Sequence, residues 1–366
     1  MSFLSHFSEV TDPRTQINVQ HDFIDVIFLT VSAVLSGAEG WSDIEVFGRD
    51  KLDWLRQYRP FENGIPVDDT IARIVRVICP EQLNKAFMNW VNEVRVETGK
   101  PQIAIDGKTL RHSYDGDKQT ALHSITAWSK DAGLVLAQLK SSGKKNENAS
   151  VLDLLDTLNI KGALISADAM NSQKKIVEKI CSENADYVLC IKNNHKQLRD
   201  EIAAYFHKVE RDNPAWIACN EQTDSGHGRI EVRRCQQLRV SEWISEAQHW
   251  KGIRSVIKIE RERHLKDKEV STETQYYISS LDIDPAAVNQ AIRAHWEVEN
   301  KVHWVLDVTF KEDDSRIRKE DGAENVGVIR RFCLNIARLH PKKASMRSKL
   351  KMAGWADEFR AELIFG

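Results

Sequence analysis

The stretch IAIDGKTLRH, residues 103–112, places an aspartate directly after three apolar residues. The apolar run predicts a short buried strand, and Gly107 predicts the turn that ends it. A carboxylate that emerges from a buried strand is costly unless a positive group meets it. For Asp106 that group is either Lys108, two positions further on, or a bound metal ion, and this stretch alone leaves both alternatives open.

The residues that follow have the pattern of a mixed α/β core. Strands are predicted at 103–106, 122–129, 134–140, 163–168 and 187–192, and helices at 148–159 and 171–184. Three strands that can form a meander, followed by helix, strand, helix and strand, are typical of a mixed sheet covered by helices. In a sheet of this order the first and fourth strands can lie side by side.

The segments on either side of this core have different patterns. Residues 1–97 carry apolar residues at helical spacing between Gly and Pro turns, which predicts a helical domain. Residues 200–284 alternate apolar and charged residues, which predicts a β-rich insertion. One helix is predicted over 285–308, followed by a basic helical tail. We therefore divide the chain into a helical domain, a first core segment at 98–199, the insertion, and a second core segment at 285–366.

The composition bounds the class of protein. With 42% hydrophobic and 29% charged residues, the chain is typical of neither a disordered nor a membrane protein. The N-terminus lacks the basic and apolar regions of a signal peptide, and the most apolar stretch, 26–38, is too short to cross a bilayer. The six cysteines form no CxxC pair, which excludes the usual zinc patterns and fits free thiols in a reducing cytosol. We therefore expect a cytoplasmic protein.

The distribution of charge is more informative than its sum. The net charge of −2 gives no indication of nucleic acid, yet eleven Lys and Arg face only three acids between 315 and 351. A basic segment of this kind attracts phosphates. The alternative is a solvated helical tail held by salt bridges, and charge alone does not decide between the two.

A second aspartate occurs in the same context as the first. In ALISADAMNSQ, residues 163–173, Asp168 follows an apolar strand and precedes a helix. If strands one and four are neighbours, Asp106 and Asp168 lie at neighbouring strand ends, where two carboxylates repel unless one is protonated or a cation bridges them. A hard, oxygen-ligated ion such as Mg²⁺ is the natural bridge. Alternatively, Asp168 caps the following helix, although Asn171 and Ser172 can also do so.

A third acid stands on the last predicted core helix. His295, Glu299 and His303 follow one another at intervals of four, so one helix face carries an acid between two imidazoles. A rigid helix that brings Glu299 to the two strand-end aspartates would complete a site for two metal ions. Such a site stabilises both the attacking and the leaving oxygen of an in-line phosphoryl displacement.

Three alternatives to this assignment stay open. Glu299 could be a surface residue that pairs with one of its neighbouring histidines. His295 and His303 could pack in the core or contact DNA, and as zinc ligands they would need a third protein ligand that the sequence does not offer. Other acids nearby could supply the third ligand, although helical phase favours Glu299; they are Asp307, Glu312, Asp313 and Asp314.

Six ordered motifs resemble one known family. They are IAIDGKTLRHSYD, DAMNSQKKIVEKI, YVLCIKNNHKQL, HGRIEVR, YYISS and HWEVENKVHWVLDVTFKEDDSRIR. Together they resemble the H-repeat-associated proteins, which belong to the ISAs-type insertion-sequence transposases, a branch of the DDE transposases with an RNase H-like catalytic core. The likeness runs essentially from end to end, and the DPR, SGAEGW, DIEVFG and NGIP segments resemble that family's N-terminal associated domain. The resemblance therefore implies an RNase H-like α/β core with a β-rich insertion and an N-terminal helical domain.

The resemblance also implies a DNA transposase. The family's acidic triad falls on Asp106, Asp168 and Glu299, which would hold two Mg²⁺ ions, with Mn²⁺ as an alternative. Strand cleavage and strand transfer imply double-stranded DNA as partner (the terminal inverted repeats of the element, and its target), a homodimer on that DNA and a place on the bacterial nucleoid. The alternative is a degenerate relic that acts only as a nuclease or only as a DNA-binding protein.

One departure from the wider transposase group concerns the Glu-bearing helix. Tyr, Arg, Glu and Lys often stand there at fixed spacing, and this chain has Ile292, His295, Glu299 and Leu306 at those positions. The Glu is kept, and His295 is the one stand-in for a basic partner. How the cut end is held, including any hairpin intermediate, therefore does not follow from the resemblance.

DNA contacts are expected from residues that border the site and from the basic tail. The candidates that border the site are Lys108, Lys192, Asn193, His295 and His303. Arg316 and Arg318 begin the basic tail and would follow the DNA backbone, which gives salt-dependent affinity without sequence information.

Overall fold

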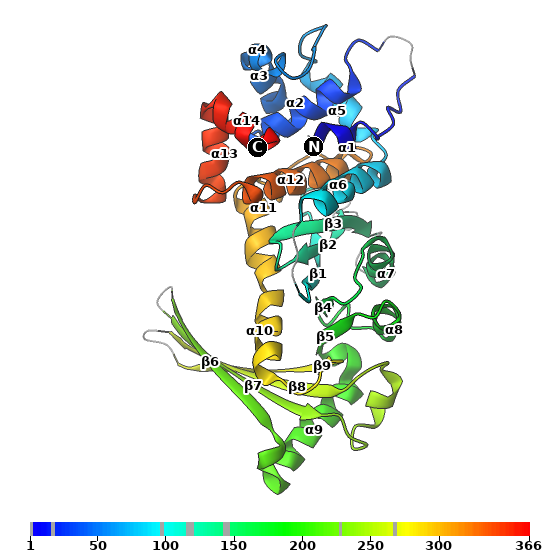
Figure 1. Cartoon of the computed structure of the whole chain (residues 1–366), viewed down its shortest axis with the longest axis vertical. Helices are drawn as coiled ribbons and strands as arrows, with labels where there is room; N and C mark the ends of the chain where they lie inside the picture. Colours follow the sequence, from blue (N-terminus) through cyan, green and yellow to red (C-terminus); the bar gives the residue numbers. More distant parts are fainter. Residues whose placement is uncertain are drawn as a thin grey trace.

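The computed structural model describes residues 3–15, 19–95, 99–114, 121–141, 147–226, 229–265 and 269–366. Figure 1 shows an elongated molecule with helices at one end, a curved group of strands at the other and the core of the sheet between them. Within the described residues the strands form a nine-stranded sheet in the order β3-β2-β1-β4-β5-β9-β8-β7-β6. The predicted boundary between residues 97 and 98 lies outside the described residues.

The core of the sheet follows the predicted order of elements. Its strands are β1 (Gln102–Thr109), β2 (His123–Ser129), β3 (Leu134–Ser141), β4 (Leu164–Ala167) and β5 (Asp186–Ile191). The first three form an antiparallel meander, while β4 runs parallel to both β1 and β5. The first and fourth strands are thus neighbours, as expected, with Ile105 opposite Ala167. The mixed α/β class of an RNase H-like core is confirmed.

The prediction that β1 ends at Gly107 is wrong. Its parallel pairing with β4 stops one residue before Asp106, whereas its antiparallel pairing with β2 continues to Thr109 opposite His123. The strand persists because one neighbour still completes its backbone hydrogen bonds. Asp106 therefore lies inside a strand that has lost its β4 neighbour at this point. Because side chains alternate along a strand, Asp106 and Lys108 share one face of β1.

The predicted insertion extends the same sheet. Its strands β6 (Ala218–Gly226), β7 (Arg229–Arg239), β8 (Ser255–Leu265) and β9 (Ser271–Ser279) are antiparallel, and β9 pairs with β5. The start of this segment is not β-structure, because α9 (Lys196–Asp212) is a helix. The buried residues of α9 recur at helical spacing; they are Leu198, Ile202, Tyr205, Phe206 and Val209. The alternating pattern of the later strands was wrongly extended to this helix.

Helices cover both faces of the core strands. The helices α7 (Glu147–Thr157) and α8 (Lys174–Ser182) belong to the hydrophobic cluster that contains Ile165 of β4, while α10 (Pro285–His295) packs in a second cluster with Leu164, the preceding residue. Beyond α10 the chain continues to α11 (Trp304–Val308), and Figure 1 shows the two helices as one rod along the sheet. Gln102 donates from Nε2 to the Ala291 carbonyl of α10 at 2.7 Å. Asp106 shares the face of Gln102 and therefore faces this rod.

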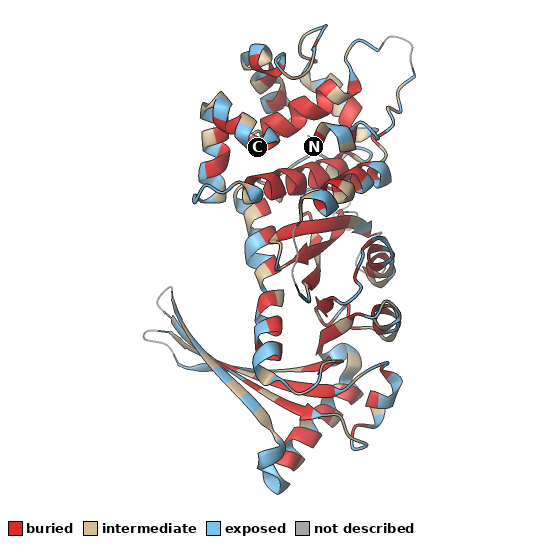
Figure 2. Ribbon diagram, in the orientation of Figure 1, coloured by how far each residue is buried: buried red, intermediate tan, exposed pale blue. Residues whose placement is uncertain are grey.

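The helical end of the molecule is built from both ends of the chain. Its N-terminal helices are α1 (Phe3–Phe7), α2 (Phe23–Leu35), α3 (Trp41–Asp50), α4 (Leu52–Leu55), α5 (Asp68–Arg76) and α6 (Pro80–Val94). Its C-terminal helices are α12 (Gly322–Leu339), α13 (Met346–Trp355) and α14 (Asp357–Phe365). Most of α12 is buried (Figure 2), because it contacts α2, α5 and α6 on one side and β3 on the other. The predicted domain division groups α12 with the core, whereas in the structure α12 also contacts the N-terminal helices.

Several cations of the basic tail are internal. Arg330, Arg331 and Lys349 are buried. Arg331 donates from Nη1 to Glu312 Oε1 at 2.7 Å, and Lys349 donates from Nζ to the Ala337 carbonyl at 2.7 Å. The number of Lys and Arg in this segment therefore overstates its basic surface, and these three side chains do not face DNA. Among the described residues, no helix has the length and apolar character that a membrane crossing requires.

Candidate active site

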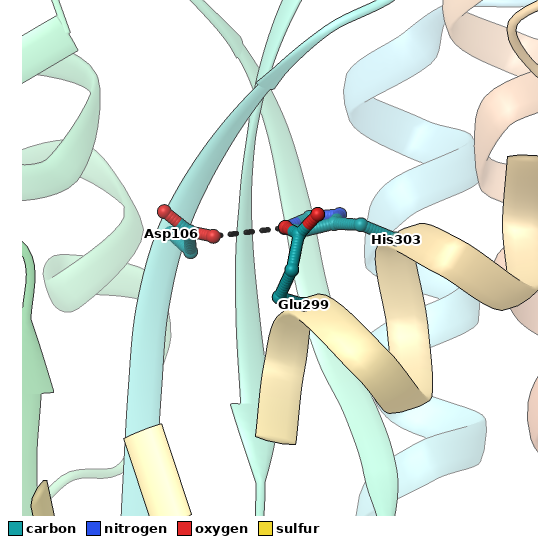
Figure 3. Close-up of side chains that lie close together, drawn as sticks. All are labelled: Asp106, Glu299 and His303. Atoms are coloured by element: carbon teal, nitrogen blue, oxygen red, sulfur yellow. Dashed lines mark hydrogen bonds and ion pairs between the residues drawn. The ribbon is translucent and has the colours of Figure 1, made fainter. Parts of the chain in front are cut away.

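Asp106 is held at two points in a half-buried position. The backbone N–H of Gly107 donates to its Oδ1 at 3.0 Å, and His303 Nε2 lies 3.1 Å from its Oδ2 (Figure 3). Burial alone would raise the pKa of Asp106, but the hydrogen bond and charge of His303, together with the charge of His295, lower it overall. The carboxylate is therefore kept ionised. The side chain that meets Asp106 is the imidazole of His303, 197 residues further along the chain.

The helix that carries Glu299 departs from the predicted continuous α-helix. A π-helical turn spans Glu299–His303, between α10 and α11. Single π turns inside helices are frequent at functional sites because they shift the side chains that follow. Here Asp106, Glu299 and His303 each offer one ligand atom within 4.8 Å of the others. Glu299 is exposed and His303 is buried beneath it, so the carboxylate is on the open side of this group.

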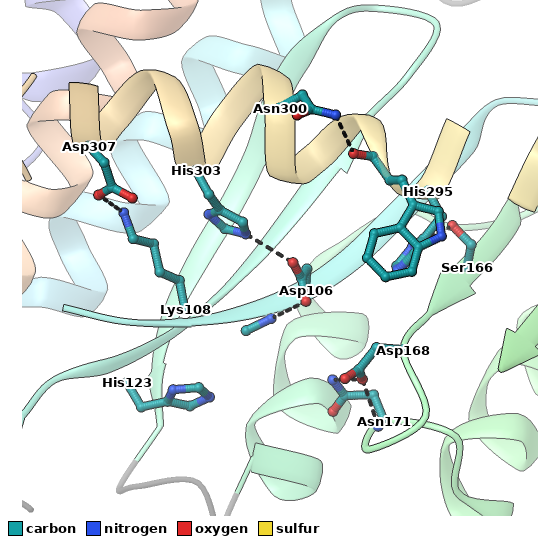
Figure 4. A network of polar contacts seen from close by, with 12 residues as sticks. Asp106, Lys108, His123, Ser166, Asp168, Asn171, His295, Asn300, His303 and Asp307 are labelled. Atoms are coloured by element: carbon teal, nitrogen blue, oxygen red, sulfur yellow. Dashed lines mark hydrogen bonds and ion pairs between the residues drawn. The ribbon is translucent and has the colours of Figure 1, made fainter. Parts of the chain in front are cut away.

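Asp168 lies just beyond β4, one step past the rung that pairs Ile105 with Ala167. Its Oδ1 accepts from Asn171 twice, from the backbone N–H at 3.1 Å and from Nδ2 at 3.0 Å (Figure 4). Burial raises the pKa of Asp168, and the charges of Asp106 and Glu147 raise it further. Asp168 is not part of the three-residue group on Asp106, but it is close enough to feel the charge of that carboxylate.

Asp168 has the hydrogen bond of a helix cap but does not stand at the start of a helix. Its side chain accepts the N–H three residues later, as a cap does, but the following helix α8 begins only at Lys174. The hydrogen bond therefore closes the turn after β4. A carboxylate can accept two N–H groups on one oxygen and keep the other oxygen for a cation.

Lys108 does not neutralise Asp106, although both residues face the same side of β1. Its Nζ forms ion pairs with Asp307 of α11 and with Glu312 Oε2, the latter at 3.1 Å. Two of the alternative third acids are therefore already paired with a cation. The pair between Lys108 and Asp307 also ties β1 to the helix that carries Glu299. A phosphate contact of Lys108, which is 9% exposed, would have to compete with both carboxylates.

The other predicted DNA contacts lie in different places. Lys192 is exposed and lines a groove of about 760 Å³ beside the π turn, together with Trp296 and Lys301. Asn193 is exposed next to it and accepts from Arg199.

Arg316 and Arg318 line a separate groove of about 300 Å³ against α5. Arg316 is exposed, whereas Arg318 donates from Nε to the His112 carbonyl at 2.9 Å and lies over the Tyr114 ring.

His295 and His303 face the site rather than the solvent. Nδ1 of His295 lies 3.2 Å from Ser166 Oγ on β4. Burial lowers the pKa of His295 despite the nearby charge of Asp106. His303 is buried, and its Nδ1 has no hydrogen-bond partner among the described residues. The two imidazoles therefore pack between the Glu-bearing helix and the sheet, which is one of the alternatives that the sequence left open.

Sequence reasoning missed a set of residues behind β1. His123 and Glu147 form a buried pair, with His123 Nε2 and Glu147 Oε2 2.8 Å apart, and Glu147 Oε1 accepts from Asn171. Nothing in the local pattern marks these residues, because the strand of His123 and the helix of Glu147 follow ordinary periodicities. Asn171 was visible only as a candidate cap.

The donor set fits a divalent cation. Carboxylate oxygens are the ligands that Mg²⁺ prefers, and Asp106, Asp168 and Glu299 supply them from β1, the turn after β4 and a π-helical turn. Partial burial, and after it the like charges of Asp106 and Glu147, raise the pKa of Asp168, and a bound cation would relieve this repulsion. The site is therefore chemically suited to hold a divalent cation.

Models of known protein families match most of this chain. A model of the transposase DDE domain matches residues 97–336, and a model described as DDE_Tnp_1-associated matches residues 4–91. The H repeat-associated putative transposase YhhI of Escherichia coli K12 is 40% identical to this chain over 99% of it and 97% of the relative. The putative transposase YncI of E. coli O157:H7 is 40% identical over 92% of this chain and 87% of its own. The inactive transposase YbfQ of E. coli K12 is 56% identical, but over only 20% of this chain and 86% of its own.

Proposed function

This chain belongs to the family of transposases with a DDE domain, and we propose that it cuts and joins DNA at a site formed by Asp106, Asp168 and Glu299. One observation carries the proposal. Asp106 from β1 and Glu299 from the helix that crosses it offer ligand atoms within 4.8 Å, and Asp168 follows the strand next to β1. Acids brought together from such distant segments are what a metal-dependent phosphoryl transfer requires.

The three carboxylates would hold two Mg²⁺ ions, with Mn²⁺ as an alternative. Bound there, such ions would supply charge stabilisation to the attacking and leaving oxygens of an in-line phosphoryl displacement, the chemistry that both strand cleavage and strand transfer need.

The protein's own part is to position and neutralise, since its side chains form no covalent bond to DNA. His303 holds Asp106, Asn171 holds Asp168, and the ion pair between Lys108 and Asp307 keeps the helix of Glu299 against β1.

We propose that the DNA backbone runs beside the π turn and along the exposed cations. Lys192 follows β5 and lines the groove beside the π turn, and Asn193 is exposed next to it. Arg316 is exposed on the groove against α5. The two grooves lie on different parts of the molecule, as contacts along an extended duplex require. The partners would be the terminal repeats of the element and its target DNA on the bacterial nucleoid, and cutting two ends together would need a homodimer.

A strand-transfer assay tests the proposal. Linear DNA that carries the sequences flanking the gene is incubated with the full chain, target plasmid and Mg²⁺. Joined product supports a transposase, nicks without joining support a nuclease relic, and bound but unaltered DNA supports a DNA-binding protein without chemistry. Asp106→Asn should abolish both cleavage and joining while DNA binding persists. Activity that survives this substitution would overturn the assignment of the triad.

A further inference from the structure

A chain of buried polar side chains leads from Asp168 to the far side of β1. Asp168 Oδ1 accepts from Asn171 Nδ2 at 3.0 Å, and the same Nδ2 donates to Glu147 Oε1 at 2.7 Å. Glu147 Oε2 lies 2.8 Å from His123 Nε2, and His123 Nδ1 lies 2.9 Å from the Thr109 hydroxyl. His123, Glu147 and Asn171 are all buried. Four segments of the chain thus meet in one hydrogen-bonded path.

The groups themselves decide which atoms donate along this path. A carboxylate accepts and does not donate, so Asn171 must turn its NH₂ group toward both Asp168 and Glu147, and His123 must carry a proton on Nε2. Asn171 Oδ1 is left without a hydrogen-bond partner among the described residues. An unpaired buried acceptor costs free energy. The two carboxylates therefore impose this orientation on the amide.

Gly107 shows how closely the path lies against β1. A Cβ atom at Gly107 would be 2.7 Å from Glu147 Oε1 and 2.9 Å from His123 Nε2. Successive side chains on a strand point to opposite faces. The path therefore runs behind the strand that presents Asp106, and within the described residues it reaches the site through Asn171 and Asp168.

We propose that His123, Glu147 and Asn171 are positioning residues whose hydrogen-bonded path fixes the Asp168 carboxylate in the orientation that receives a divalent cation. This inference deepens the proposed function and rests on it. Without Glu147, the Asn171 amide can rotate about its terminal torsion and turn an acceptor toward Asp168. The carboxylate would then lose a donor and its fixed direction. Outer hydrogen-bond partners of metal ligands contribute about 10- to 100-fold in metal affinity.

The test is Mn²⁺ binding to the full chain without DNA. Binding is monitored by the loss of the electron paramagnetic resonance signal of the free ion. Asn171→Ala and Glu147→Ala should each weaken Mn²⁺ affinity by about 10- to 100-fold. His123→Ala should weaken it as well. His123→Gln should stay close to the wild-type affinity, because its amide nitrogen can replace Nε2 as the donor to Glu147. If Glu147→Ala does not fold, Asn171→Ser is measured in its place. This variant removes the Nδ2 group that donates to both Asp168 and Glu147.

Asn325→Ala is the matched control. Asn325 is also fully buried, and its Nδ2 also donates two hydrogen bonds, to the Val75 and Ile78 carbonyls, both at 2.9 Å. It lies in α12, outside the site. This variant should lose stability as Asn171→Ala does, while its Mn²⁺ affinity stays that of the wild type. Equal losses of affinity in the two variants would show a general effect of instability and overturn the inference.

Two further variants separate this inference from the proposed function. Asp106→Asn and Asp168→Asn remove proposed ligands, so both should lose Mn²⁺ binding. If they lose it while the Asn171 and Glu147 variants bind like the wild type, only the positioning role is wrong. If Asp106→Asn binds like the wild type, or if the wild type binds no Mn²⁺, the proposed metal site itself fails and the positioning role fails with it.

Discussion

Replacing Glu312 by Gln should destabilise the protein strongly, although Glu312 is no ligand in the proposed site. Its fully buried side chain lies between two cations, 2.7 Å from Arg331 Nη1 and 3.1 Å from Lys108 Nζ. Gln keeps the size of the side chain but removes its charge. Arg331, which is also fully buried, would then have lost the carboxylate that compensates its charge.

The loss in the free energy of unfolding follows both from the pKa of Glu312 and from the cost of breaking a buried ion pair. Burial would raise the pKa of Glu312, but the charges of Arg331 and Lys108 lower it from 4.5 to about 2. At about 1.4 kcal/mol for each pKa unit, this difference corresponds to roughly 3 kcal/mol of stability at neutral pH. Removing one partner of a buried ion pair costs about 3–5 kcal/mol. Because the pKa is lowered on folding, the contribution is present above pH 4.5 and is lost as the pH falls toward 2.

Chemical denaturation at pH 7 measures this loss as a difference in the free energy of unfolding. Glu221→Gln is the control, because Glu221 Oε2 also pairs with an arginine, Arg234 Nη2, at 2.8 Å, but both side chains are about half exposed. Its expected loss is below about 1 kcal/mol. The difference in the free energy of unfolding between wild type and Glu312→Gln should become smaller below pH 4.5. Equal losses in the two variants, or a gap that stays constant into acid, would refute the reasoning.

Three further substitutions test other parts of the structure. Gly107→Ala should cost about 1–3 kcal/mol, seen as a lower melting temperature, because the new Cβ would lie 2.7 Å from Glu147 Oε1; an unchanged melting temperature would contradict the close packing. Asp168→Asn should abolish cleavage yet raise the melting temperature of the ion-free protein, because it removes a half-buried carboxylate repelled by Asp106 and Glu147; a lower melting temperature would speak against this repulsion. Arg316→Ala should reduce the slope of log affinity for DNA against log salt concentration by about 1, and an unchanged slope would remove Arg316 from the DNA path.

The strands around Asp106 and Asp168 could be predicted because their signal is local. An apolar run followed by an acid is visible in either segment by itself, and the order of elements then makes the two strands neighbours. The end of β1 could not be predicted in this way. Gly107 resembles a turn residue, but pairing with β2 carries the strand on, and Gly107 is needed for close packing rather than for a turn.

The partners of charged residues could not be predicted either, because they come from distant segments of the chain. Lys108 is two positions from Asp106, so proximity in sequence suggested a pair, yet its ammonium meets Asp307 and Glu312. Asp106 instead meets His303, which a local pattern could place on a helix face but not against a given strand. The charge of the basic tail was counted correctly from the sequence, but burial, which the count ignores, removes Arg331 from the surface.

The position of α12 determines when the protein can become functional during its synthesis. Phe332 of α12 has its ring centroid 5.2 Å from that of Phe3 and 4.9 Å from that of Phe7. The N-terminal helices also contact one another, but the aromatic contacts between α1 and α12 form only after α12 has been synthesised. A nascent chain that already contains Asp106, Asp168 and Glu299 therefore still lacks the part of the core that α12 shares with the N-terminal helices. A truncation that removes α12 (Gly322–Leu339) leaves all three acids in the chain but should therefore destabilise the N-terminal helices.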